Sequence, residues 1–380
     1  MSDQTYAKGL EGVIAAESTI CRIDGANGKL YYRGYSIQDL VEQCTFEEVT
    51  YLLLYDALPT PDQLAEFSGK MRASRELAPP ILDMVRNFPK ESHPMQLLQS
   101  VISYLSAYVE HVIQHSETCN CRNTLHQVVQ MTSVVAAYQR LKEGGDYVPP
   151  RDDLSHGANF LYMMRGEEPD PLEGEIMDKC LILHAEHGFN ASTFTARVVA
   201  STLSTCYCSI SSAIGSLFGP LHGGANERVI DMVNAIGSKD KVKAWIDDAL
   251  ARKKKVMGMG HRVYKAMDPR AVVMEGFLEQ LSEKRGDSHY HDILKEIQTV
   301  FRGIMEAKGK PIYPNVDFFS GAVYLLLGIP SILFTPIFAM ARVSGWLAHI
   351  LEQRSDNRIY RPKCLYVGPD ERPLVSVEER

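Results

Sequence analysis

The chain lacks the features of secreted, fibrous and disordered proteins. Residues 1–5 contain neither the basic nor the apolar region of a signal peptide, and the eight cysteines are scattered rather than arranged as a disulfide framework. Apolar residues make up 45% and charged residues 23% of the 380 residues, which is ordinary globular usage and excludes low-complexity classes. We therefore expect a folded, cytoplasmic protein.

Basic charge is also scarce. Lys and Arg total 40 against 47 Asp and Glu, which gives a formal net charge of −7. This balance argues against a general nucleic-acid-binding protein, which needs a basic surface. An anionic substrate would require arginines gathered at one place, because the overall field repels it.

Two runs without charge, residues 198–221 and 318–341, are long enough to span a bilayer. The second contains Pro330 and Pro336, which predict two buried helices broken at 328–330 and again at 335–336. The first is rich in small and hydroxylated residues. Uncharged helices also occur at the centre of large soluble cores. We therefore prefer a central helix, packed on all sides at a subunit interface, to a membrane span.

Helical periodicity dominates the rest of the chain. Residues 19–24 and 29–33 flank a Gly/Asn turn, which is typical of a β-hairpin. Elsewhere apolar residues recur at three- and four-residue steps. The expected helices are 37–54, 61–75, 78–87, 94–114, 124–143, 171–187, 192–217, 226–236, 240–252, 270–284, 290–308, 321–327 and 336–353. The sequence thus predicts an all-α fold with one small N-terminal hairpin.

One stretch differs in composition from its surroundings. Residues 225–321 carry many charges, whereas the segments on either side are apolar. This contrast predicts a small, solvated helical domain at 225–321, inserted into a large helical domain formed by 1–224 and 322–380. Small mobile domains often close over substrates.

A group of histidines and cysteines offers one interpretation of function. His111, His115 and Cys119 recur every four residues, and Cys121 and His126 follow. These residue types bind zinc, although C-x-C is not the usual spacing of a structural zinc site. A metal-binding protein without enzymatic activity is therefore an alternative, while the preferred interpretation contains no metal.

Four other positions suggest catalysis. His187 ends a histidine-rich segment, His222 lies in a Gly/Pro turn between two helices, and His261 follows a Gly-x-Gly pair within a basic segment. Asp317 precedes two phenylalanines, and desolvation there would raise its pKa and suit a general base. From the local sequence alone, the histidines could be structural and Asp317 could cap a helix.

Four segments in this order resemble the citrate synthase family: HAEHGFNAS (184–192), GPLHGGANE (219–227), GMGHRVYKAMDPR (258–270) and YPNVDFFSG (313–321). The resemblance runs along nearly the whole chain. It implies a mainly helical homodimer in which a large and a small domain close over the substrates. The implied enzyme is citrate (Si)-synthase of the tricarboxylic acid cycle, a transferase. It condenses acetyl-CoA with oxaloacetate and hydrolyses the citryl thioester to citrate and CoA.

The resemblance also implies a role for each matching residue. Asp317 would remove a proton from the methyl group of acetyl-CoA, His222 would hold the thioester oxygen, and His261 would polarise the ketone of oxaloacetate. Within one subunit, the oxaloacetate ligands would be His187, Arg270 and Arg342. The partner subunit would contribute Arg361. Coenzyme A would lie at Gly258, Met259, Gly260, Lys265 and Asn315. No permanently bound cofactor is implied, because acetyl-CoA is a co-substrate.

A near relative remains an alternative. The 2-methylcitrate synthases share these motifs and use propionyl-CoA, and one methylene changes pocket energy by only about 1–3 kcal/mol. Met259 stands where the family often has an aromatic residue, which leaves the coenzyme A contacts open. The chain lacks the N-terminal extension of the NADH-regulated bacterial enzymes, so we expect no inhibition by NADH.

Overall fold

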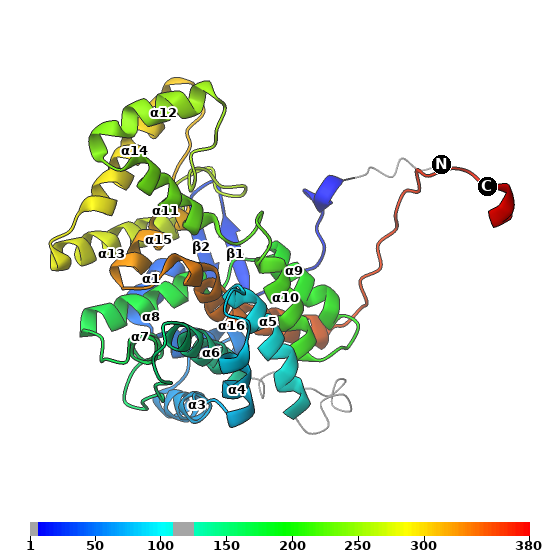
Figure 1. The fold of residues 1–380 in the computed structure, drawn as a ribbon, viewed down its shortest axis with the longest axis horizontal. Coiled ribbons are helices and arrows are strands. Elements are labelled where there is room, and N and C mark those ends of the chain that lie inside the picture. Colours follow the sequence, from blue (N-terminus) through cyan, green and yellow to red (C-terminus); the bar gives the residue numbers. More distant parts are fainter. Residues whose placement is uncertain (1–6, 109–124) are drawn as a thin grey trace.

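The computed structural model describes residues 7–108 and 125–380. Helices form most of this part of the chain, around one small sheet (Figure 1). The all-α fold class is therefore confirmed. Helices α6 (His126–Lys142), α8 (Pro171–Ala185) and α9 (Ala191–Ala200) pack against α16 (Phe334–Ser355), which lies at the centre of the molecule (Figure 1).

The sheet has three antiparallel strands, β1 (Cys21–Asp24), β2 (Lys29–Tyr32) and β3 (Tyr35–Ser36). Strands β1 and β2 form the predicted hairpin, and β3 was not predicted. The turn is closed by the carboxylate of Asp24, which accepts hydrogen bonds from the backbone and side-chain amides of Asn27 at 3.1 and 2.8 Å. These bonds favour the charged form and lower the pKa of Asp24.

The first half of the chain supplies the other helices of the main body. They are α1 (Ile37–Gln43), α2 (Phe46–Tyr55), α3 (Pro61–Ala73), α4 (Pro79–Asn87), α5 (Pro94–Leu105) and α7 (His156–Arg165). The single helix expected over 37–54 is wrong, because Thr45 and Glu48 form a capping box that starts α2. Helix α7 was not predicted.

The two uncharged runs fold as broken helices. In the first, Thr205 caps a new helix, α10 (Cys206–Leu217), after α9 has ended. The expectation of one helix is therefore wrong. Cys208 on α10 is exposed in the single chain, so packing on all sides would require a partner subunit. Apolar periodicity continues through the break and does not reveal it.

In the second run, the expected break at 328–330 is confirmed between α15 (Val316–Leu326) and the short helix η5 (Ser331–Leu333). The break expected at 335–336 is wrong. Pro336 lies in the first turn of α16, where its missing N–H costs no helical hydrogen bond. Of the described helices, only the segment Ser331–Ser355 is long and apolar enough to cross a membrane, and 83% of its apolar window is buried inside the protein.

The remaining helices stand together at one end of the molecule (Figure 1). They are α11 (Ala225–Ile236), α12 (Val242–Ala251), α13 (Pro269–Arg285) and α14 (His289–Ala307). Helix α15 packs against α11 and α13 and connects this group to α16. The loop between α12 and α13 carries His261 and lies beside the tip of the β-hairpin (Figure 1).

Candidate active site

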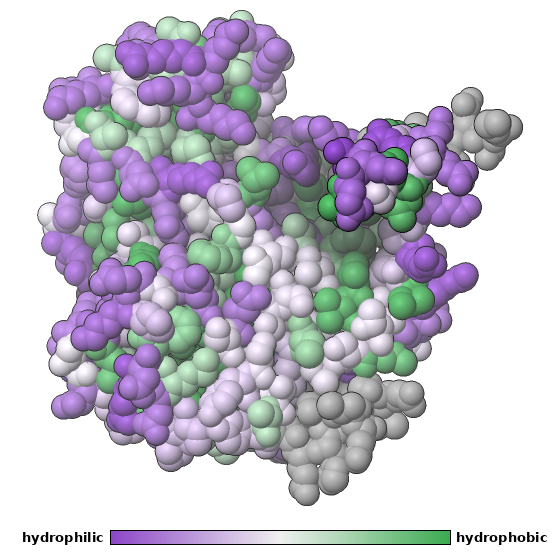
Figure 2. Space-filling view, turned by 45° about the vertical axis from the view of Figure 1, so that its right-hand side comes forward, coloured by the Kyte–Doolittle hydropathy of each residue, from purple (hydrophilic) through white to green (hydrophobic). Residues whose placement is uncertain are grey.

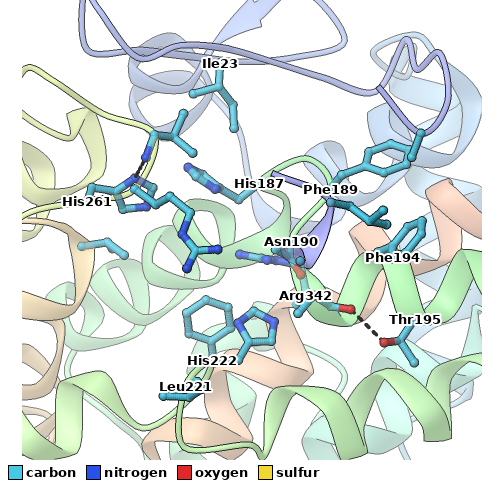
Figure 3. Close-up of a pocket in the computed structure, with 18 of the residues that line it drawn as sticks. Ile23, His187, Phe189, Asn190, Phe194, Thr195, Leu221, His222, His261 and Arg342 are labelled. Carbon is cyan, nitrogen blue, oxygen red and sulfur yellow. Dashed lines mark hydrogen bonds between the residues drawn. The ribbon is translucent and has the colours of Figure 1, made fainter. Parts of the chain in front are cut away.

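A cavity of about 910 Å³ lies among the N-terminal segment, the loops that follow α8, α10 and α12, and the helices α13, α15 and α16. Figure 2 shows the surface hollowed beneath the protruding terminal segments. Six of the predicted site residues line this cavity: His187, His222, His261, Arg270, Asp317 and Arg342. Figure 3 shows three of the histidines and Arg342 around one common space.

Asp317 lies in the first turn of α15, but it does not cap that helix. The cap is Asn315, whose side-chain oxygen accepts the Asp317 N–H at 3.0 Å and whose amide donates to the Gly260 carbonyl at 2.8 Å. The capping alternative for Asp317 is therefore wrong. Its carboxylate is left to face the cavity.

The pKa of Asp317 is raised to about 6, mainly because burial disfavours the carboxylate. The negative charge of Asp268 adds to this effect, whereas Arg270 and Arg342 oppose it. The group is thus a stronger base than an ordinary aspartate, yet it remains ionised at neutral pH. This combination suits a general base.

His261 is held by the backbone that follows it. The N–H groups of Val263 and Tyr264 donate to Nδ1 at 3.0 and 3.2 Å. Because an N–H can only donate, Nδ1 carries no proton, and the neutral ring has its proton on Nε2. Burial and the charge of Arg270 lower the pKa of His261 to about 4. The ring is therefore a neutral hydrogen-bond donor at physiological pH.

His222 is oriented in the same way by the start of α9. The N–H of Ser192 donates to Nε2 at 3.2 Å, and the Ser192 hydroxyl lies 2.8 Å from the same nitrogen. The proton of the neutral ring then lies on Nδ1. The pKa of His222 is lowered to about 4 by burial and by the charge of Arg342.

His187 completes the histidine group. Its Nε2 lies 3.2 Å from the Tyr264 hydroxyl, and its ring meets the His261 ring edge-on with centroids 5.3 Å apart. Burial, Arg270 and Arg342 hold its pKa well below the usual value. All three imidazoles are thus neutral, and two of them are linked through Tyr264.

Two buried arginines provide positive charge. Asp268 binds Arg270 through both carboxylate oxygens, at 3.0 Å to Nε and 2.8 Å to Nη2. The Nε of Arg342 donates to the His184 carbonyl at 2.6 Å, and its buried Nη2 has no hydrogen-bond partner among the described residues. An unsatisfied guanidinium donor beside a cavity suits a carboxylate ligand.

The loop that carries His187 is anchored by a buried carboxylate. Glu186 accepts hydrogen bonds from the Gly188 N–H and from Nε2 of His349, the latter at 3.0 Å. Arg197 donates to Nδ1 of His349 at 3.2 Å, which places the histidine proton on Nε2. Buried side chains far from the ligand space therefore set the position of His187.

Several supporting residues were missed from the sequence: Glu186, Ser192, Tyr264 and Asp268. Asp268 could have been found, because Asp-Pro is a typical start of a helix and its carboxylate caps α13. The others act through partners that only the tertiary fold brings near. No signal in the sequence identifies them.

The predicted coenzyme A residues lie beside the cavity rather than in its wall. Gly258, Met259 and Gly260 pair with the segment before Asp317, through hydrogen bonds that join Gly260 N to Tyr313 O at 2.8 Å and Asn315 N to Gly258 O at 2.9 Å. Lys265 is exposed on the loop that follows them.

Arg361 is not brought to the other site residues within one chain. It is exposed in the C-terminal segment and lines a second cavity of about 840 Å³, between the N-terminal and C-terminal segments. Figure 1 shows both segments projecting from the same side of the body.

The metal alternative falls mainly outside the described residues, which include His126 but not His111, His115, Cys119 or Cys121. The Nε2 of His126 lies 2.6 Å from the Tyr207 hydroxyl. In the part of the chain that the structure describes, no three His, Cys, Asp or Glu side chains are grouped so as to hold a metal ion.

A base of raised pKa facing neutral donors suits the removal of a weakly acidic proton while a developing oxyanion is held. The fold and the cavity thus define a helical enzyme of carbon-acid chemistry that binds a carboxylate substrate. Sequence comparison narrows the class. The chain belongs to the citrate synthase family, and the family domain described as "Citrate synthase, C-terminal domain" matches residues 9–363.

Individual relatives are similar to this chain along nearly the whole length of both chains. The chain is 45% identical to a citrate synthase of Deinococcus radiodurans, over 98% of this chain and 99% of the relative. The crystal structure of citrate synthase from Pyrobaculum aerophilum superposes with a TM-score of 0.92 at 42% identity, covering 98% of this chain and 95% of that chain. A ternary complex of carboxymethyl coenzyme A and oxaloacetate with the Thermoplasma acidophilum enzyme gives 0.90 at 32% identity, covering 99% and 100%. A 2-methylcitrate synthase of Corynebacterium glutamicum is 41% identical, over 98% of this chain and 97% of the relative.

Proposed function

We propose that this protein is a citrate synthase, which condenses acetyl-CoA with oxaloacetate and hydrolyses the citryl thioester to citrate and CoA. The observation that carries the proposal is the meeting of Asp317, His222 and His261 with Arg270 and Arg342 around one cavity. These residues come from four separate segments of the chain. Relatives named citrate synthase, 45% and 42% identical to this chain, support this activity.

The first step is the removal of a proton from the methyl group of acetyl-CoA by Asp317. This proton is only weakly acidic, so the carboxylate can remove it only where the developing enolate oxygen is stabilised. The Nδ1–H of His222 supplies that hydrogen bond. A pKa of about 6 makes Asp317 a better base without neutralising it at physiological pH.

Carbon–carbon bond formation follows on oxaloacetate. The Nε2–H of His261 polarises the ketone oxygen, and the two carboxylates bind to Arg270, Arg342 and His187. Arginine matches a carboxylate with two parallel donors and therefore fixes the substrate's orientation. Coenzyme A lies along Gly258–Gly260, Lys265 and Asn315.

Water must be excluded until condensation is complete, and domain closure provides this. The mobile domain is formed by residues 225–321, and the large domain by 1–224 and 322–380. The boundary at 321 falls inside α15, so a rigid helix would require residues 322–326 to move together with the small domain.

The active form is a homodimer in the cytoplasm. Three features support a dimer: the exposed edge of α10, the projecting terminal segments, and the placement of Arg361 away from its own chain's cavity. The terminal segments carry exposed apolar side chains: Ile14, Leu365, Tyr366, Val367 and Leu374. A partner would cover them, and Arg361 of the partner subunit would add a third positive charge to the site.

Steady-state kinetics with oxaloacetate and either acyl-CoA tests the function and its alternative. We expect oxaloacetate-dependent release of CoA with citrate as product, and a higher kcat/KM for acetyl-CoA than for propionyl-CoA. A preference for propionyl-CoA would establish the 2-methylcitrate synthase instead. No CoA release with either substrate would contradict both.

A further inference from the structure

The turn of the β-hairpin packs directly on the loop that carries His261. The N–H of Lys265 donates to the carbonyl of Gly25 at 2.8 Å. Figure 1 shows this turn, at the tip of β1 and β2, beside the loop between α12 and α13. Ile23 on β1 lines the active-site cavity, close to His187 in Figure 3. The only sheet in the described chain is therefore part of the frame of the site.

Glycine is required at both points of closest approach. A Cβ on Gly25 would lie 2.3 Å from the Val263 carbonyl oxygen, and one on Gly28 would lie 2.5 Å from the Met267 carbonyl oxygen. Both obstacles are backbone atoms, so a side chain could be accommodated only if the loop moved. Gly28 also has a positive φ of +62°, which the turn itself demands, whereas Gly25 has no such requirement. The glycine at position 25 is thus explained by the loop rather than by the turn.

The atoms that meet the turn belong to the residues that hold His261. Val263 faces Gly25 with its carbonyl, while its N–H donates to Nδ1 of His261 at 3.0 Å. Tyr264 donates to the same nitrogen and places its hydroxyl 3.2 Å from His187. A shift of the loop at Val263 would therefore move the donor that fixes the proton of His261.

We propose that the hairpin turn, through Gly25 and Gly28, is a positioning element that seats the loop 263–267 and thereby aims His261 at the ketone of oxaloacetate. Neither glycine lines the cavity. The proposal rests on the proposed function of His261. The turn lies in residues 1–224 and the loop in 225–321, so this contact also joins the two proposed domains.

Gly25→Ala is the test, and Gly276→Ala is the matched control. Gly276 lies on α13, which carries Arg270 in its first turn, and a Cβ there meets no atom within 4 Å. We expect Gly25→Ala to lower kcat/KM for oxaloacetate about 10-fold to 100-fold, since a misplacement of about 1 Å can cost about 10²-fold. The kcat should fall as well, because His261 acts in the transition state. The control should match the wild type in both parameters.

The pH profile separates positioning from a general structural defect. Hydrogen bonds to Nδ1 oppose protonation of His261, so their loss should raise its pKa from about 4 in Gly25→Ala and steepen the acid limb of kcat/KM below the step near pH 6 that Asp317 sets. A second variant, Asn27→Ala, loosens the turn by removing the side-chain hydrogen bond to Asp24, while the backbone N–H bond to the same carboxylate stays and no atom is added at the contact. Asn27→Ala should show the same changes in kcat/KM, kcat and pH profile to a smaller extent. It replaces Gly25→Ala as the test if that variant does not fold.

The outcomes distinguish this proposal from the proposed function. An inactive wild-type enzyme would refute the function. An active wild type, with Gly25→Ala and Asn27→Ala kinetically equal to Gly276→Ala and with unchanged pH profiles, would refute the positioning role alone.

Discussion

The described part of the chain holds several buried clusters of arginine, carboxylate and histidine, and two of them differ in one respect: one lines the cavity of about 910 Å³, and the other lines neither of the two cavities described above. The first is the active site. The second, which we call the packed cluster, consists of Glu47 on α2, Arg75 after α3, His156 on α7 and Asp178 on α8. Both contain the same residue types, and the arginines of both are buried. Residue type and burial therefore do not by themselves identify a site.

The difference lies in what the polar groups face. In the packed cluster, Asp178 accepts the N–H groups of Phe46 and Gly157, both at 2.9 Å, and so fixes the starts of α2 and α7. Arg75 donates to the carbonyls of Arg151 and Leu154. These groups of the packed cluster bind the chain itself, and its atoms without a hydrogen-bond partner among the described residues, Arg75 Nε and Nη2 and His156 Nδ1, are buried away from both described cavities. In the active site, Asp317 and Arg342 keep oxygen and nitrogen atoms free beside an empty volume. The packed cluster should therefore control stability, and the cavity should control the reaction.

The largest effect on stability is expected from Arg75→Met. This change leaves the buried carboxylates of Glu47 and Asp178 without their cation, which costs about 3–5 kcal/mol of unfolding free energy. Chemical denaturation measures the loss, and kcat of the folded enzyme should stay at the wild-type value. Arg86→Met, which breaks an exposed ion pair with Asp83, is the control and should cost about 0–1 kcal/mol. Equal losses of unfolding free energy in Arg75→Met and Arg86→Met would contradict the claim that the packed cluster controls stability.

The opposite pattern is expected for His222→Gln. Loss of the donor to the enolate oxygen should lower kcat about 10²- to 10³-fold, with little change in stability. His156→Gln in the packed cluster should lower the melting temperature and leave kcat intact, since His156 bonds only to Thr132 among the described residues. Kinetics and thermal melts of both variants would sharpen the comparison. A large loss of kcat in His156→Gln would contradict it.

The smallest effects are expected in the dependence on pH. Burial and Asp178 raise the pKa of Glu47 from 4.5 to about 7, so the folded state holds a proton that the unfolded state releases. Stability should therefore fall as pH rises from about 4.5 to about 7, and then level off. Glu47→Gln should flatten this fall in denaturation curves. The kcat/KM of the same variant should still rise through about pH 6, where Asp317 ionises. If kcat/KM of Glu47→Gln no longer depended on pH, the reaction would depend on the packed cluster, and the two clusters would not be independent.

Much of the fold could be predicted because long helices repeat their apolar residues at a fixed spacing. The errors arise where tertiary contacts override that pattern. Helix α7 was missed because Gly157 follows a proline-rich segment and indicates a loop. In the structure, a Cβ at Gly157 would lie 2.4 Å from the Asp178 nitrogen, so the glycine is required by helix packing. Nothing local to the sequence reveals that neighbour.

The candidate site shows the same limit. The motifs predicted five residues that the structure brings to one cavity, each at the end of a helix or in a glycine-containing turn, and the family resemblance implied a sixth, Arg342, which lies in the middle of α16. They could not reveal that Ser192 orients His222, that Asp268 binds Arg270, or that the hairpin meets the loop of His261. These contacts join segments far apart in the chain, so they exist only once the fold has formed.

The central claim is that Asp317 acts as the base toward acetyl-CoA within the cavity formed with His222 and His261. Single-turnover formation of citrate, with both substrates saturating, tests it most directly in the wild type and in Asp317→Asn. We predict that the variant is slower by about 10³-fold or more, while its melting temperature is unchanged or higher because a buried carboxylate has been removed. A rate within about tenfold of the wild type, in a variant that folds normally, would contradict the account.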